Sequence, residues 1–267
     1  MPVPRPTAVA GLFYPADPTE LRRELRHYLA NAAPVPHLGA IKALVVPHAG
    51  YIYSAAVAAA AYSALAPQAA RIRRVILLGP THRVPVHGMA VPATDTFLSP
   101  LGPIPLDQAA RQAIADLPGV VVDDQPHARE HALEVQLPFL QTVLGSFELL
   151  PLAVGHCPPE TVAAVLERLW DGDDTLIVVS SDLSHYLPYP QARRQDEATS
   201  RQVLALDAAL EHDQACGATP LNGLLLQARR HGLVPRLLDL RNSGDTAGSR
   251  EEVVGYAAFA FTPETTP

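Results

Sequence analysis

Histidine and aspartate side chains follow apolar runs of the chain, and they are the residues best suited to chemistry. His48 ends the run VVPH, and His82 ends LLGPTH. Asp182 and His185 end VVSSDLSH, and Asp245 ends LDLRNSGD. If these runs are strands of one parallel sheet, their carboxyl ends meet at one edge, where ligands bind in open α/β folds. We therefore expect three imidazoles and two carboxylates to converge at that edge.

Two neutral imidazoles and one carboxylate on one face of a metal ion leave positions open for small molecules, and this set suits iron(II). Zinc also accepts two histidines, one acid and a water, so ligand type leaves the metal open. His185 is a candidate proton donor or acceptor beside such a centre. Each residue alone is also an ordinary turn or capping residue. Their shared position after several strands is what favours a site.

A second histidine pair lies in the segment HAREH, where His127 and His131 stand four residues apart with Glu130 between them. This spacing matches the inverted zincin pattern of two metal ligands and a glutamate base. Pro126 places His127 at or before the first helical turn, where the two rings need not share a face. A zinc hydrolase is therefore a minor alternative. We expect His131 and Glu134 to line the cleft or to support a metal ligand.

Composition narrows the classes of protein that the chain can represent. Its 267 residues carry a formal net charge of −7, the opposite of the basic surface that nucleic acid requires. Two cysteines give no disulfide framework, so we expect a cytoplasmic protein. The uncharged stretch 43–70 is interrupted by Pro47 and Gly50 and is too weakly apolar to span a membrane. The sequence contains none of the patterns GxGxxG, GxxxxGK[ST], GxSxG and CxxC. Their absence argues against a phosphate-binding loop for nucleotides and against a serine nucleophile.

The elements that position these residues follow from an alternation of apolar runs and helical stretches. Short continuous apolar runs suit strands buried on both faces of a parallel sheet. We expect strands near 42–46, 74–79, 147–154, 175–182, 236–242 and 253–261. We expect helices from Pro18 onward and near 53–66, 107–116, 130–144, 159–170, 190–210 and 219–231. The proline-rich segment 89–106 reads as a hairpin or edge excursion. The predicted fold is a single doubly wound α/β domain over residues 1–267, with a mostly parallel central sheet.

Several motifs, in the same order, resemble the Memo-like family, whose bacterial and archaeal members are called AmmeMemoRadiSam system protein B. The likeness begins at RPTAVAGLFYPADPTEL and continues through VPHAGYIYSAAVAAAAY, LLGPTHR, EHALEVQLPFL, SSDLSHY, NSGDTAG and VVGYAAFAF. It covers nearly the whole chain. The fold of that family is similar to that of class III extradiol dioxygenases, so the resemblance implies an α/β protein with a non-haem iron site.

The resemblance also implies roles for individual residues. His48 and His82 match the two metal-binding histidines of the family. The third ligand position, a cysteine in animal members, falls on Asp245. An acid there restores the two-histidine, one-carboxylate set and favours iron(II) over copper, with copper or zinc as the other candidate metals. His185 matches the position that resembles the acid/base histidine of the dioxygenases.

The expected function is that of an iron(II)-dependent, dioxygenase-like oxidoreductase acting on a small molecule. We expect Asp182 and Cys216 near its cleft, since Cys216 stands at a recurrent family motif in ACGATP. The main alternative is a binding module without catalysis, in which the same cleft receives a peptide or a partner protein. The family name associates bacterial relatives with radical S-adenosylmethionine and AMMECR-type partners.

Overall fold

Four parallel strands form the centre of the sheet in the computed structural model, which describes residues 3–34, 38–170 and 172–264. In spatial order they are β1 (Ala43–Val46), β8 (Thr175–Ser180), β2 (Arg74–Pro80) and β7 (Glu148–Val154). Almost every residue of these strands is buried, as the continuous apolar runs predict. Their common direction brings their carboxyl ends to one edge of the sheet.

Antiparallel strands extend the sheet on both flanks, so the nine-stranded sheet is mixed. On one side lie β11 (Val253–Pro263), β10 (Leu233–Asn242) and β9 (His185–Leu187), the last paired with β11. On the other side lie β3 (Met89–Val91) and β6 (Val120–Val122). The proline-rich segment also forms a separate hairpin, β4 (Thr96–Ser99) with β5 (Gly102–Pro105), outside the central sheet.

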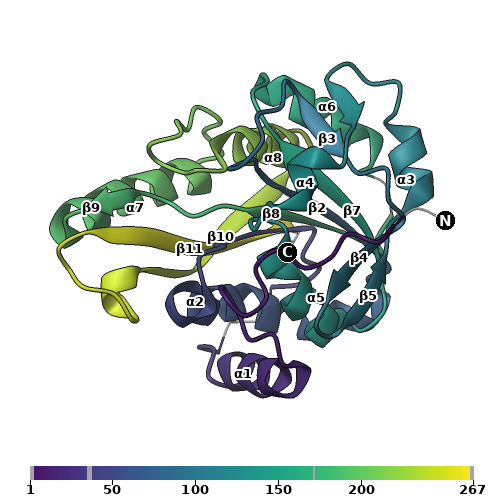
Figure 1. Ribbon diagram of the computed structural model, residues 1–267. Helices are drawn as coiled ribbons and strands as arrows, with labels where there is room; N and C mark the ends of the chain where they lie inside the picture. The colour runs from purple at the N-terminus through teal and green to yellow at the C-terminus, as the bar shows by residue number, and fades with distance from the viewer. Residues whose placement is uncertain (1–2, 35–37, 171, 265–267) are drawn as a thin grey trace.

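Helices cover both faces of the sheet (Figure 1). One face packs against α1 (Pro18–Ala30), α2 (Tyr51–Ala64), α5 (Leu137–Leu144) and the 3₁₀ turn η1 (Ala66–Arg71). The other packs against α3 (Gln108–Ala113), α6 (Pro159–Arg168), α7 (Tyr189–Leu204) and α8 (Ala218–Arg230). Successive residues of β1 alternate between the two cores, with Leu44 and Val46 in the first and Ala43 and Val45 in the second. The doubly wound α/β prediction is confirmed. None of the described helices is long and apolar enough to cross a bilayer.

The segment 130–144, expected to be one helix, is helical only at its end. A four-residue helix, α4 (Gln125–Ala128), precedes it, and a 3₁₀ turn, η2 (Glu134–Gln136), leads into α5. Pro138 lies in the first turn of α5, where its missing amide costs no helical hydrogen bond. The residues between α4 and η2 are therefore a loop.

Close packing brings this loop against the end of β2. A Cβ on Gly79 would lie 2.9 Å from Leu133 Cδ2 and 3.4 Å from the Cβ of Ala132. Real Cβ atoms rarely tolerate such contacts, so the glycine allows the loop to lie directly on the strand. Side chains of the loop consequently reach the carboxyl edge of the sheet.

Candidate metal centre

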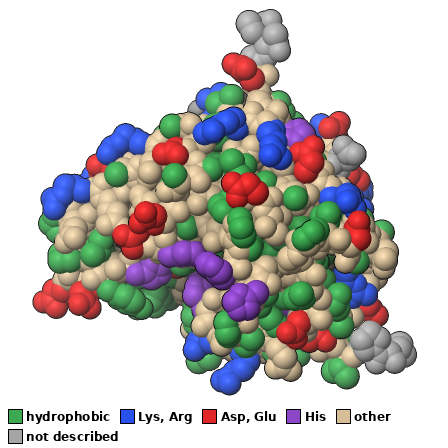
Figure 2. All heavy atoms as spheres, turned by 90° about the horizontal axis from the view of Figure 1, so that it is seen from above, with side chains coloured by type: hydrophobic (Ala, Val, Ile, Leu, Met, Phe, Trp, Pro, Cys, Tyr) green, Lys and Arg blue, Asp and Glu red, His purple; other side chains and the backbone are tan. Residues whose placement is uncertain are grey.

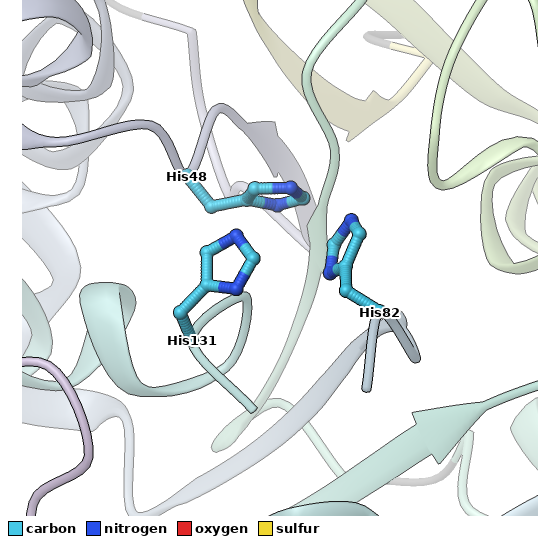
Figure 3. A group of neighbouring side chains, drawn as sticks. All are labelled: His48, His82 and His131. Atoms are coloured by element: carbon cyan, nitrogen blue, oxygen red, sulfur yellow. The ribbon is translucent and has the colours of Figure 1, made fainter. Parts of the chain in front are cut away.

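Three histidines meet at the carboxyl edge of the parallel strands. His48 follows β1, His82 follows β2, and His131 comes from the loop between α4 and η2. Each offers one ring nitrogen to a group in which all donor atoms lie within 4.8 Å of one another. Ring centroids are 5.2 Å apart for His48 and His82, 5.3 Å for His48 and His131, and 4.6 Å for His82 and His131. Figure 3 shows the three rings turned toward a common centre.

A buried hydrogen-bond network sets the orientation of His48. Its Nδ1 lies 3.0 Å from Ser180 Oγ. The Ser180 hydroxyl donates to the Ala132 carbonyl at 2.7 Å and accepts from Gln136 Nε2 at 2.8 Å. Since the hydroxyl proton is already used, Ser180 must accept from His48 Nδ1. The neutral ring then carries its lone pair on Nε2, the atom available to a metal ion.

The environment of His48 also keeps its ring uncharged at neutral pH. Burial lowers its pKa to about 4. Asp182 acts in the opposite direction, while His131 and His82 reinforce the lowering. A metal ion binds only the neutral imidazole, so protons do not compete for His48 near pH 7.

Glu130 hydrogen-bonds His82 and lies beside the His131 ring. Its Oε1 lies 2.9 Å from His82 Nδ1 and 3.2 Å from His131 Nδ1, and its Oε2 accepts from the His82 amide at 2.6 Å. Burial opposes its ionisation, but the contacts with His131 and His82 lower the pKa of Glu130 well below its usual value. A carboxylate on the outer nitrogen of a ligand histidine fixes the ring and raises its basicity. This role was missed from the sequence, although the position of Glu130 between two histidines in HAREH was a usable signal.

His127 does not join the group. Because α4 ends at Ala128, His127 and His131 never share a helical face. The His127 ring is buried and its Nε2 lies 2.9 Å from the Ala90 carbonyl. The inverted zincin arrangement is therefore not formed, and with it the basis of the hydrolase alternative is lost.

The three histidines line a cleft of about 630 Å³. Figure 2 shows histidine side chains gathered in a hollow of the surface. His185, on β9, lines this cleft together with Asp182. Asp182 is almost fully buried, and its Oδ1 accepts from the His48 amide at 2.7 Å, while its Oδ2 lies 4.0 Å from His48 Nε2. The cleft thus places a free imidazole and a carboxylate beside the histidine group.

Cys216 lies beside His48, with its Sγ 3.3 Å from His48 Nε2, the nitrogen available to a metal ion, and 3.3 Å from the Asp182 amide nitrogen. Burial raises the pKa of its thiol to about 12, and the charge of Asp182 adds to this effect. In the metal-free protein the residue is therefore a neutral thiol near pH 7. It touches one member of the group and is not part of the group.

Glu134 and Asp245 lie apart from the histidine group. The fully buried Glu134 accepts from Arg5 Nη1 at 2.7 Å, from the Tyr14 hydroxyl at 2.7 Å and from two backbone amides of the N-terminal segment. Asp245 is exposed, accepting from the Tyr189 hydroxyl at 2.6 Å and from the Asn242 amide at 3.1 Å. The group of donors within reach of one ion contains His131 and not Asp245.

Fold and site together define an α/β protein with a histidine cluster suited to a metal ion at the carboxyl edge of its parallel strands. Residues 5–260 match the family described as "Memo-like protein", so the chain belongs to this family. It is 36% identical to a MEMO1 family protein of Methanopyrus kandleri, over 96% of this chain and 98% of that protein. It is 35% identical to one of Aquifex aeolicus, over 96% of this chain and 98% of that protein. The resemblance found in the sequence is confirmed.

A solved structure, that of an uncharacterised protein of Escherichia coli K12, has a similar fold. The TM-score is 0.52 at 15% sequence identity, covering 81% of this chain and 99% of that chain. At this identity the likeness concerns the fold alone.

Proposed function

We propose that this protein is a metal-dependent oxidoreductase that holds iron(II) on His48, His82 and His131. The observation that carries the proposal is the set of three ring nitrogens within 4.8 Å of one another, two of whose rings are oriented by Ser180 and Glu130. Asp245, the third ligand that the family resemblance implies, is bound to Tyr189 instead. His131 therefore takes the third position in this proposal.

The donor chemistry fits such an ion. Imidazole nitrogens bind iron, zinc and copper, whereas soft thiolates select copper(I). Cys216 Sγ is not among the donor atoms that lie within reach of one ion, which argues against a copper(I)–thiolate site. When bound, iron(II) with three protein ligands supplies open positions for dioxygen and a chelating substrate.

The side chains around the histidine group have separate tasks in the proposed reaction. Asp182 accepts a hydrogen bond from the His48 amide and places its other carboxylate oxygen 4.0 Å from His48 Nε2. His185 faces the cleft, where it accepts a proton from the bound substrate and returns it to the product.

The decisive experiment measures metal content and an open coordination position. Protein prepared without oxygen is loaded with iron(II), analysed for bound metal, and treated with nitric oxide as a spectroscopic probe. We expect one iron per chain and an iron–nitrosyl signal in the wild type and in His185→Ala. His48→Ala should lose both.

Failure to bind stoichiometric iron, or retention of zinc against excess iron(II), would overturn the assignment. A bound iron that never reacts with nitric oxide would overturn the oxidoreductase role, because the open position is then missing.

A further inference from the structure

Aromatic side chains form the walls of the cleft beyond the histidine group. Phe13 lies against His131, with ring centroids 4.9 Å apart, and Tyr53, Tyr186 and Tyr256 also line the cleft. A planar ligand is favoured on such walls because aromatic surfaces bury large apolar areas and stack with defined geometry.

Tyr186 is held at the mouth of the cleft in an unusual conformation. Its φ is 56°, in the left-handed region, and 70% of the residue is exposed. It lies at an irregularity between β9 and β11, where Val253 pairs with Leu187 and Val254 pairs with His185. A left-handed backbone at a residue other than glycine costs about 1 kcal/mol or more and is common at ligand-binding positions. The paired neighbours keep the Tyr186 ring at the rim.

The charged side chains that line the cleft are of one sign. Asp182 and Glu252 contribute carboxylates, and no lysine or arginine is found among the described residues of the lining. Within the described chain, the Glu252 carboxylate makes no hydrogen bond or ion pair, and the residue is exposed. A bound anion would meet uncompensated negative charge on this wall, whereas a cation would be attracted.

We propose that the cleft selects aromatic ligands that carry a positively charged amine. The chelating end of the ligand faces the histidine group, its ring lies between the aromatic walls, and its ammonium group is directed to Glu252. This inference rests on the proposed function for the metal-bound end. Tyr186 and Tyr53 add cation–π attraction for the amine.

The test uses zinc-loaded protein, so that binding is measured without turnover. Calorimetry compares three benzohydroxamic acids that differ only in the para group: aminomethyl, methyl and carboxylate. We expect the aminomethyl compound to bind about tenfold more tightly than the carboxylate, corresponding to ~1.4 kcal/mol, with the methyl compound between them. The preference should shrink as salt is added, since the Glu252 side is exposed.

Two variants test whether the Glu252 carboxylate causes the preference for the aminomethyl compound. Glu252→Gln should reduce the preference at least threefold, whereas the neighbouring Glu251→Gln should leave it unchanged, because Glu251 is exposed and does not line the cleft. Both variants should load zinc as the wild type does. Equal or tighter binding of the carboxylate, or a preference that survives Glu252→Gln, would overturn the inference while leaving the metal site intact.

If the protein takes up neither zinc nor iron(II), the proposed metal site fails, and the charge preference is then measured on metal-free protein. Ligand-observed NMR with benzylamine and benzoate replaces calorimetry in that case. Binding of benzylamine alone supports the inference, and binding of benzoate, or of neither, contradicts it.

Discussion

A single hydroxyl determines which nitrogen of His48 is available for a metal ion. Ser180 can only accept from His48 Nδ1, because its own proton is donated to the Ala132 carbonyl. The ring is therefore prepared for metal binding before any ion arrives. Glu130 acts in a similar way, because its single carboxylate contacts both His82 and His131.

Replacing Ser180 with alanine should weaken metal binding. Without an acceptor, His48 Nδ1 loses its buried partner and the tautomer is no longer fixed. We expect metal affinity to fall about 10- to 100-fold, the usual effect of removing a group that orients a ligand. A titration with cobalt(II), whose visible spectrum reports ligand binding, measures the change. Ser200→Ala, which removes another buried serine hydroxyl, on α7 and outside the cleft lining, is the matched control. Unchanged affinity in Ser180→Ala would refute the argument.

His131 and Asp245 are the two candidates for the third metal ligand. Substituting each residue in turn shows which one contributes to metal affinity. His131→Ala should lower cobalt(II) affinity about 100-fold or more, since it removes one of three donors. Asp245→Asn should change it less than about threefold, because the carboxylate is engaged with Tyr189 on the surface. The opposite order of effects would show that Asp245 moves into the site when metal binds.

At the scale of elements, the N-terminal segment is attached to η2 by one buried ion pair. Glu134 receives hydrogen bonds from Arg5, from Tyr14 and from the amides of Ala8 and Val9. This segment also carries Phe13 to the cleft wall. The glutamate expected near the cleft therefore affects it through the backbone that it holds.

Breaking this pair should be costly, because Arg5 would keep a buried, uncompensated charge. Glu134→Gln should reduce the free energy of unfolding by about 3–5 kcal/mol, measured by urea denaturation. A loss below about 1 kcal/mol in Glu134→Gln would mean that the pair does not anchor the segment.

For the whole molecule, two buried neutral histidines make stability depend on pH. Burial lowers the pKa of both His48 and His127 to about 4. An unfolded histidine titrates near pH 6.5, so between about pH 6.5 and 4 the unfolded chain binds protons that the native protein excludes. Stability is then complete above about pH 6.5 and decreases as the pH falls through this window.

Urea denaturation of the metal-free protein from pH 7.5 to 4.5 should show this loss, approaching about 3 kcal/mol for each histidine at the lower end. His127→Gln should show about half of the pH-dependent loss, because it removes one of the two buried histidines whose pKa is lowered to about 4. A free energy of unfolding that stays constant from pH 6.5 to 4.5 would contradict the burial of these neutral rings.

The central strands and the positions of His48, His82, Asp182 and His185 were predictable from the sequence. Apolar runs of strand length are buried on both faces of a parallel sheet, and residues that follow such strands gather at one edge. The roles of Glu130 and His131 were less accessible, because both lie in a loop whose path depends on packing against Gly79. Loops carry no periodic signal from which such a path can be read.

By itself, the sequence determined the alternation of strands and helices, the family, and the kinds of side chain at the carboxyl edge, since these follow from local patterns of residue type. Only the tertiary structure decided which donors lie within reach of one ion, which ring nitrogen is free, and which histidines stay neutral. Distances between side chains depend on loop paths, and ring orientation and charge depend on burial and on partners distant in the chain. His131 in the group and Asp245 beside Tyr189 are the clearest cases.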